Sequence, residues 1–403
     1  MRSVLFASLL GSALSAAAAV PRVSDVAMTS YSPCFITYTL SEAPGIVTFD
    51  ILTNGVSIGA QNIRNAVGDV NRLVQPGTRT IRWDAHEIWP GHKFRTPCVT
   101  ARVTVWPENA PPDWLAVNLT QSDCPVTYYA SEAALPWGAI QGNSAYKGDI
   151  LLMRKIHASH VLSFMGSPET EPNRATDGRE TRRMCTLTND YYMAIYPLTF
   201  RHYYLLNQGP AATEARLTPV VTLTYNQLRY QTGDAYNNMP IDFPSKTSRT
   251  QVGSSSYLKA WRDKTGLVLD LPTSAQWEFA CRAGTDTPLY NGDATAANLA
   301  AISQSGYNKG YEVGKYACNS WQLYDMIGNC YEWCLDYYED NIAPDAVTDP
   351  LGPTARGDRG RAVRGYHGND IHKRSAFVSS KRYINDNKGD YTYNGFRLCI
   401  TLF

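Results

Sequence analysis

Short apolar runs that alternate with polar positions fill the first quarter of the chain. Each run is rich in β-branched or aromatic residues and is bounded by turn residues, which is typical of half-buried strands. The clearest runs are residues 35–40, 46–52, 77–83 and 99–105. Asn54 and Gly55 follow the second run and are the strongest short signal for a hairpin turn. The pattern predicts a small all-β sandwich over residues 22–107.

The pattern changes after a proline-rich segment. Residues 107–113 (PENAPPD) interrupt regular structure and mark a linker. We assign residues 108–149 to this linker, with a strand pair that joins the two domains as the alternative. Residues 150–403 then mix short strands, helices and long polar loops. The expected fold class is therefore α+β, with a loop-rich second domain preceded by the small all-β sandwich.

Capping signals predict two short helices in the second domain. A helix over residues 199–208 would have Thr199 as its N-cap, and one over residues 256–264 would end at Gly266. Strands are predicted at residues 164–168 and 184–195, on either side of a polar loop at 169–183.

A third helix, predicted over residues 271–284, is the best defined. Thr273 and Gln276 have the spacing of a capping box, in which each side chain satisfies a free backbone N–H of the other. Four residues then fall on one helical face: Trp277, Ala280, Cys281 and Gly284. This face is expected to pack on the core.

The stretch 324–333 (YDMIGNCYEW) carries the strongest candidate chemistry. Asp325 and Glu332 lie seven residues apart, and Gly328-Asn329 between them favours a tight turn. Such a turn can bring carboxylates and carbonyls to one point, and hard oxygens in that number are what Ca²⁺ selects. The alternative is that Asp325 caps a turn and Glu332 faces solvent from a strand.

Composition excludes several classes of function. Thirty-seven basic and 36 acidic residues leave a net charge near zero, which argues against nucleic acid or an anionic membrane surface as a partner. The sequence contains no GxSxG elbow, HExxH, P-loop or dinucleotide-binding fingerprint.

The N-terminus has the pattern of a targeting segment. Arg2 precedes an apolar, small-residue run, and Ala17 to Ala19 offer a cleavage site, so residues 1–19 are expected to be a signal peptide. The apolar run is short for a membrane span, and no other stretch approaches 18 apolar residues. A secreted, periplasmic or cell-surface location follows as an expectation.

Nine cysteines follow this segment, and an odd number leaves at least one unpaired within the chain. Cys34 and Cys98 lie near the two ends of the first domain, which favours a disulfide between them. No Cys or His spacing predicts a zinc site.

Four motifs in order resemble one known family. Residues 324–333 resemble the glycine-asparagine-x-tryptophan-glutamate-tryptophan signature of the formylglycine-generating enzyme (sulfatase-modifying factor) family, with Tyr331 in place of the first Trp. Three other segments resemble its opening strand, its most recognisable helix and its closing strand: 164–168, 271–284 and 395–398. The resemblance implies a C-type-lectin-like fold. Residues 22–107 resemble the immunoglobulin-like accessory modules of bacterial surface proteins, which implies a spacer or adhesion role.

The resemblance also implies ligands and a cross-link. A structural Ca²⁺ would be bound by the positions that match the family: Asp325, the carbonyls of Gly328 and Cys330, and Glu332. A second calcium site would fall near Asn298-Leu299 and residues 305–311, without assigned ligands. The resemblance further implies a disulfide between Cys281 and Cys399.

Enzymes of this family oxidise a cysteine of sulfatases to formylglycine with O₂ and a copper ion held by two cysteines. Cu(I) is soft and prefers thiolates, but residues 364–397, which match that region, contain no cysteine. Lys373 lies near one expected cysteine, and the family's Gly-Gly-Ser is replaced by Gly365-Tyr366-His367. His367 and His372 could bind copper, although a histidine pair in a loop more often faces solvent. The sequence therefore argues against copper.

Two functions remain as hypotheses. The first is a calcium-stabilised module that displays a ligand-binding surface for a protein or glycan, because residues 366–394 mix Tyr, Asn, Asp and Thr as paratopes do. The candidate ligand-binding residues are Tyr366, His367, Asn369, His372, Lys373, Tyr383, Asn385, Tyr391 and Tyr393. Some relatives vary this segment through diversity-generating retroelements; the alternative is a plain polar loop. The second hypothesis is a formylglycine-generating oxidoreductase acting on exported sulfatases or another protein.

Overall fold

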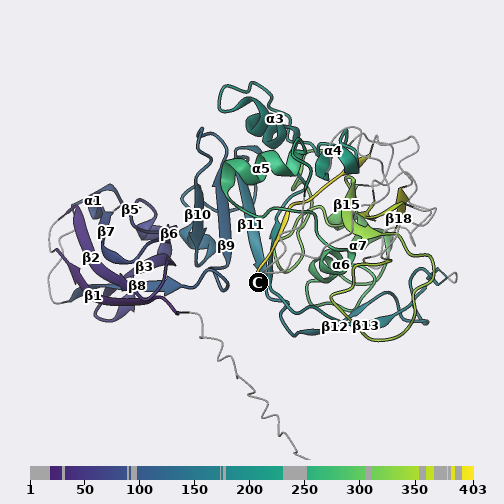
Figure 1. Ribbon diagram of the computed structural model, residues 1–403, viewed down its shortest axis with the longest axis horizontal. Helices are drawn as coiled ribbons and strands as arrows, with labels where there is room; N and C mark the ends of the chain where they lie inside the picture. Colours follow the sequence, from purple (N-terminus) through teal and green to yellow (C-terminus); the bar gives the residue numbers. More distant parts are fainter. Residues whose placement is uncertain are drawn as a thin grey trace, which may run out of the picture.

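The structure is a computed structural model, shown in Figure 1. It describes residues 19–29, 32–88, 90–91, 98–172, 174–175, 178–229, 252–304, 310–353, 360–366, 379, 383–385 (backbone only) and 393–403. The α+β fold class predicted from the sequence is confirmed: strands predominate, helices are few, and an all-β part comes first.

The first part of the chain forms two antiparallel sheets, coloured purple to blue in Figure 1. One has the order β1 (Arg22–Met28), β2 (Cys34–Ser41), β7 (Gly77–Trp83), β5 (Val67–Gly68). The other comprises β4 (Val56–Ser57), β3 (Gly45–Thr53) and β6 (Leu73–Val74), with β8 (Val99–Trp106) also paired to β3. A short helix, α1 (Ala85–Ile88), and a 3-10 turn, η1 (Ala60–Ile63), connect them.

The two sheets share one core. Ile36 and Trp83 from the first sheet and Val47 and Ile51 from the second are fully buried in the same cluster. The predicted hairpin is confirmed, since Asn54 and Gly55 have positive φ angles and join β3 to β4. All four strands predicted in this part are also confirmed.

All nine cysteines lie among the described residues, and none of them forms a disulfide. The predicted Cys34–Cys98 disulfide is therefore wrong. Cys34 is buried on β2 opposite Trp83, whereas Cys98 is exposed just before β8, so the two thiols lie in different environments.

A five-stranded antiparallel sheet organises the second part. Its order is β10 (Val126–Tyr129), β9 (Trp114–Asn118), β11 (Ile150–Ile156), β14 (Tyr191–Ala194), β20 (Cys399–Thr401). The segment 108–149 thus contains an antiparallel strand pair, and this pair extends the sheet of the second part. A 3-10 turn, η2 (Glu132–Ala134), and a short helix, α2 (Ala145–Gly148), connect the pair to β11.

Both faces of this sheet are covered, which explains why its strands are apolar at nearly every position. Alternate residues of β11 are buried in different cores. Ile150 and Leu152 pack in the first core, and Leu151 and Met153 pack in the second. Helix α6 (Ser274–Arg282) packs in the first core, and α3 (Phe200–Gln208) and α5 (Tyr257–Thr265) pack in the second. Two further helices are α4 (Tyr225–Arg229) and α7 (Ala296–Ile302).

The predicted caps are confirmed. Thr199 caps α3, Gly266 ends α5 in the left-handed conformation, and Thr273 with Gln276 forms the capping box of α6. Ser256, predicted as the first residue of the second helix, is instead its N-cap. Trp277, Ala280 and Cys281 pack in the core as expected, but Gly284 does not, because it lies exposed beyond the end of α6.

The strand predicted over residues 184–195 is wrong as a single element. It consists of β13 (Arg183–Thr186) and β14, which belong to different sheets. The polar residues Thr188, Asn189 and Asp190 separate them, and Asp190 Oδ1 accepts hydrogen bonds from two backbone N–H groups at 158 and 159. Short polar side chains that bind backbone groups favour a turn over a strand.

Two small sheets complete the second part. One has the order β12 (Leu162–Met165), β13, β16 (Val347–Thr348). The other has the order β18 (Tyr383–Asn385), β17 (Arg361–Gly365), β15 (Tyr331–Tyr337), β19 (Asn394–Gly395) and contains the candidate site.

Direct contacts join the two parts. The backbone N–H of Tyr128 on β10 donates to Asn71 O, and Arg64 Nε donates to Ala133 O. Lys155, buried on β11, donates to Pro111 O in the connecting segment, and Arg154 pairs with Asp113 at 2.9 Å. None of the helices in the described part of the chain has the length and apolar character needed to span a bilayer.

Candidate functional site

A sharp turn leads into β15. Asp325, Gly328 and Asn329 all have positive φ angles, of 53°, 96° and 64°. A Cβ atom at position 328 would lie 1.9 Å from Ser303 Oγ, so only glycine fits there. The Gly-Asn pair in the sequence therefore forms the turn that it predicts.

Side chains of the turn hold a neighbouring loop. Asn329 Oδ1 accepts from the Tyr311 backbone N–H at 2.9 Å, and its Nδ2 donates to Tyr311 O at 3.1 Å. Asp325 Oδ2 accepts from the Gly314 N–H at 2.7 Å. Residues 310–314 are thus fixed against the turn by polar contacts rather than by a sheet.

Asp325 is a buried carboxyl that uses only one of its two oxygens in hydrogen bonds. Its Oδ1 atom is enclosed and has no hydrogen-bond partner among the described residues. Burial raises the pKa of this carboxyl to about 6, although the Gly314 N–H and the charge of Arg397 act in the opposite direction. An unsatisfied buried oxygen of this kind is suited to a proton or a cation.

Glu332, in contrast to Asp325, uses both of its carboxylate oxygens in hydrogen bonds. Its side chain is fully buried on β15, where Oε1 accepts from Arg397 Nη2 at 2.8 Å. Its Oε2 accepts from Arg397 Nε at 3.1 Å and from Trp277 Nε1 at 2.7 Å. Arg397 donates further to the carbonyls of Ala194 and Tyr324. One ion pair therefore connects β15, α6, β14 and the closing segment of the chain.

A second buried ion pair lies beside the first. Arg364 on β17 donates from Nη2 to Glu278 Oε2 at 2.9 Å and from Nε to Ser274 Oγ at 2.9 Å. Burial would raise the pKa of Glu278, but the charges of Arg364 and Arg282 outweigh it, and the pKa lies below its usual value. Helix α6 is thereby bound to β17 through charge-assisted hydrogen bonds.

These contacts hold both ends of the segment that was predicted to bind ligands. Gly365 and Asn394 lie opposite the same residue, Tyr331, on the two sides of β15. Tyr366 is nearly buried, and its ring meets that of Tyr331 edge to face at 5.7 Å. The Tyr393 carbonyl accepts from the Tyr331 N–H.

The other predicted ligand-binding residues can be placed only in part. Tyr383 and Asn385 lie on β18, paired with Val363 and Arg361 of β17, and only their backbone is described. Five residues lie outside the described part of the chain: His367, Asn369, His372, Lys373 and Tyr391. Residues 383–385 belong to the same sheet as β17 and β19, and residues 366 and 393 directly adjoin those two strands.

The residues of the turn fit a calcium ion in part. Asp325 Oδ1 is an unused anionic ligand, and carbonyls of the turn are of the type that Ca²⁺ accepts. Glu332 would share its oxygens with Arg397. The Cys330 carbonyl lies close to Gly365, where a Cβ would be 2.9 Å away. Among the described residues, no three His, Cys, Asp or Glu side chains gather as a metal-binding group.

The cysteines near this frame are buried thiols. Burial raises the pKa of Cys281 to about 12 and holds those of Cys330 and Cys399 well above their usual value. The implied Cys281–Cys399 disulfide is wrong, because both residues are free. Cys399 Sγ lies 3.8 Å from the Oε1 atom of Gln276, at the start of α6. Gln276 is more than one helical turn away from Cys281 on the same helix.

Sequence reasoning missed the acidic partners. Neither Glu278 nor the Trp277 indole N–H was identified as a partner in the buried ion pairs. The available signal was a Glu278–Arg282 pair at i, i+4 within an apolar helix, which indicates a charge that is paired inside the core.

Comparison with known proteins agrees with this geometry. Residues 165–402 match the family described as FGE-sulfatase, the sulfatase-modifying factor enzyme 1-like domain. The chain is similar to the formylglycine-generating enzyme of Thermomonospora curvata, at 31% identity over 111 residues, covering 22% of this chain and 37% of that protein. It is also similar to the inactive C-alpha-formylglycine-generating enzyme 2 of Bos taurus, at 33% identity over 92 residues. This match covers 20% of this chain and 29% of that protein.

Among solved structures, Treponema denticola variable protein 1 aligns with a TM-score of 0.44 and 19% identity, over 62% of this chain and 95% of that one. The chain spans well under half the length of the curated relatives it matches. The family match itself covers more than half of the chain. The chain therefore belongs to the family of sulfatase-modifying factor enzyme 1-like domains.

Proposed function

We propose that this chain is an exported, calcium-stabilised member of the family that displays the segment between Tyr366 and Tyr393 as a ligand-binding surface for a protein or glycan. In this proposal the chain does not carry out the copper-dependent oxidation. Its frame fixes the two ends of the segment, and the residues between them determine the ligand.

One observation carries the proposal. Two buried ion pairs, Arg397–Glu332 and Arg364–Glu278, hold the strands from which the segment leaves and to which it returns. Fixed ends would allow much of the intervening sequence to vary, with the exception of Ser379 and β18, which contact the frame. Residues 364–397 are rich in Tyr, Asn and Asp and contain no cysteine.

The chemistry of the cysteines supports a role in binding. A copper oxidant needs thiolates in an open cleft, and low-pKa thiols occur at partly exposed, electropositive sites. The thiols of Cys281, Cys330 and Cys399 are buried and have raised pKa values. A relative named as an inactive formylglycine-generating enzyme is consistent with loss of the oxidation elsewhere in the family.

The first experiment separates binding from oxidation. The purified chain is loaded with copper and incubated in air with a peptide containing Cys-x-Pro-x-Arg, and mass spectrometry follows the conversion of the thiol to an aldehyde. We expect no turnover. Turnover at an enzyme-like rate would contradict the proposal and favour the oxidoreductase alternative, which family membership supports.

The second experiment tests display. The wild-type chain is screened on a glycan array and against proteins of the source cell surface, and hits are compared with a variant carrying His367→Ala, His372→Ala and Tyr391→Ala. We expect the variant to lose binding without a change in melting temperature. Hits that are unaffected by the triple substitution would place the binding surface elsewhere on the molecule.

Calcium provides a separate prediction. Saturation with CaCl₂ after EGTA treatment should raise the melting temperature, since a ligand at 100 times its Kd adds about 2.7 kcal/mol of stability. Asp325→Asn should abolish this increase, because it removes the negative charge and replaces one carboxylate oxygen with an amide NH₂, whereas the exposed control Asp345→Asn should retain it. An identical increase in both variants would show that Ca²⁺ binds without Asp325.

A further inference from the structure

Exposed apolar side chains gather on the small sheet that contains β12 and β13. Leu162 is 61% exposed, Val161 44%, Phe164 42% and Met184 39%. Phe164 on β12 pairs with Met184 on β13, so their side chains lie on the same face, and Leu162 shares it two residues along. Figure 1 shows β12 and β13 at the lower margin of the molecule.

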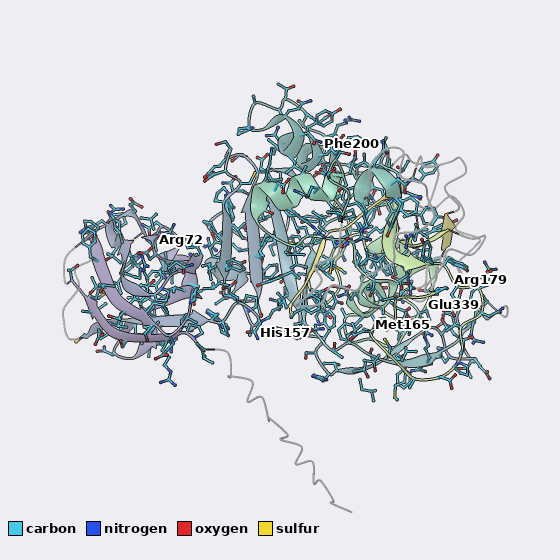
Figure 2. The ribbon with its side chains drawn as sticks, in the orientation of Figure 1. Arg72, His157, Met165, Arg179, Phe200 and Glu339 are labelled. Carbon is cyan, nitrogen blue, oxygen red and sulfur yellow. The ribbon has the colours of Figure 1, made fainter. Side chains whose placement is uncertain are left out.

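A groove of about 420 Å³ lies beside these residues. It is bounded by β12 on one side and by the end of α6 and Trp321 on the other. Its walls include Leu162 and Phe164 from one face of β12 and Ser163 from the other face. Because residues of both faces line it, the groove runs along the edge of the strand. His157 lies at this groove, and Figure 2 labels it together with Met165 at the other end of β12.

The edge of β12 that borders the groove is open. Within the described part of the chain, β12 pairs only with β13 and is the outer strand of its sheet. In an antiparallel pair, alternate residues direct their N–H and C=O groups away from the partner strand. The outer edge of such a strand can pair with another extended chain.

The rim of the groove carries an accessible acidic group. Arg182 lies over the Phe164 ring at 4.3 Å and pairs with Asp286 Oδ2 at 2.6 Å. The Asp286 side chain is 65% exposed, compared with 29% for Arg182. Arg282 also lines the groove, but its charge is paired with the buried Glu278. Asp286 is therefore positioned to attract a basic residue of a partner.

We propose that this groove binds an extended peptide segment of another protein, which adds to β12 as a further strand. One large apolar side chain of the peptide enters the groove between Phe164 and Trp321, and a basic side chain two residues along reaches Asp286. Main-chain hydrogen bonds would supply affinity, and alternate side chains would supply specificity.

The size of the surface favours a peptide over a second copy of the chain. The apolar patch consists of only four partly exposed side chains. A stable dimer buries about 800 Å² per partner, which this patch and a four-residue edge do not provide. The groove volume is within the range of sites that hold small ligands or single peptide anchors.

The probe is a fluorescein-labelled, capped peptide of sequence Thr-Val-Thr-Phe-Thr-Lys-Thr, in which Phe and Lys lie on one face when extended. Fluorescence anisotropy with the full chain should give saturable binding with a Kd of about 100 μM, as for a small, transient interface. N-methylation of alternate backbone amides should weaken binding about tenfold, because it removes main-chain hydrogen bonds and keeps the side chains.

Variants test the named residues. Leu162→Lys should weaken binding about tenfold, while Val56→Lys, an exposed apolar residue on β4, should leave it unchanged. Asp286→Asn should weaken binding of the Lys peptide but not of its Lys-to-Thr counterpart. Because Leu162 and Asp286 are exposed, the melting temperatures of these variants should match the wild type.

Three results would overturn the inference. One is the absence of saturable binding by the wild-type chain, and another is equal binding of the N-methylated peptide. The third is concentration-dependent dimerisation of the wild type in analytical ultracentrifugation that Leu162→Lys abolishes, since this would show that a second copy occupies the groove.

Discussion

At the scale of single residues, the most consequential groups are charges with no access to solvent. Arg397 and Glu332 are both fully buried, so each depends on the other for compensation of its lost hydration. Replacing Arg397 by Met should leave Glu332 charged and unpaired, and we expect a loss of about 3–5 kcal/mol in the free energy of unfolding measured with urea.

Two controls define this prediction. Asp263→Asn breaks the exposed Lys259–Asp263 pair and should change stability by less than about 1 kcal/mol. The double variant Arg397→Met/Glu332→Gln should be less destabilised than Arg397→Met alone, because no charge stays buried. If the double variant lost as much as both single changes added together, the pair would not be the origin of the effect.

His202 gives a pH-dependent prediction. Burial lowers the pKa of its imidazole from 6.5 to about 4, partly offset by a hydrogen bond with Ile150 O. The unfolded chain therefore binds a proton near pH 6.5 that the folded chain binds only near pH 4. As pH falls through this window, stability should decrease by up to about 3 kcal/mol.

The measurement compares urea unfolding at several pH values between 4 and 7 for the wild type and His202→Gln. Glutamine can preserve the capping box with Thr199 and does not titrate. The stability of the wild type relative to the variant should rise with pH and level off above about 6.5. Parallel curves for the two proteins would mean that His202 does not contribute to the pH dependence.

Residue roles could be predicted from the sequence where a motif was complete. The Gly328-Asn329 turn and the Thr273–Gln276 capping box follow from local chemistry and occur as expected. The partners of Arg364 and Arg397 did not follow, because Glu278 and Glu332 lie more than 60 residues away along the chain. Pairing over that distance depends on the tertiary fold and leaves no local pattern.

At the scale of elements, the end of β17 has a strict requirement for glycine. Gly365 has a φ of 69°, and a Cβ there would lie 2.9 Å from the Cys330 carbonyl oxygen. Gly365→Ala should therefore cost about 2–3 kcal/mol in urea unfolding, from backbone strain and the close contact together. Gly284→Ala is the matched control, since its φ is 87° but no atom lies within 4 Å of a Cβ; it should cost about 1 kcal/mol. Equal losses would indicate that the contact at Cys330 relaxes without cost.

Elements with strong local signals were predictable, and elements set by pairing were not. Helices α3, α5 and α6 begin and end where their caps indicate. The long strand predicted over residues 184–195 proved to be two, because alternation of apolar residues continues through a turn that only the contacts of Asp190 define. Register between sheets is a tertiary property, so periodicity alone could not divide that run.

At the scale of the whole molecule, the first part of the chain has a core of its own. Trp83 is fully buried in it, and this core is separate from the two that surround the five-stranded sheet. We expect two calorimetric transitions. Trp83→Ala should lower the midpoint temperature of only one of them, and the free energy of unfolding of the first part should fall by about 3–5 kcal/mol. Phe35→Ala, at a partly exposed position on the neighbouring strand β2, should have a small effect. A single transition that Trp83→Ala shifts as a whole would mean that both parts unfold together.

The placement of Gly365 and Asn394 on the two sides of Tyr331 has a practical consequence for protein engineering. The chain leaves and re-enters this sheet across two strand spacings, about 10 Å. For a flexible loop whose two ends are fixed at this separation, doubling the number of residues raises the entropic cost of loop closure by only about 0.6 kcal/mol. A randomised insert cloned between these two positions would thus be selected for what it recognises, with little selection on its length.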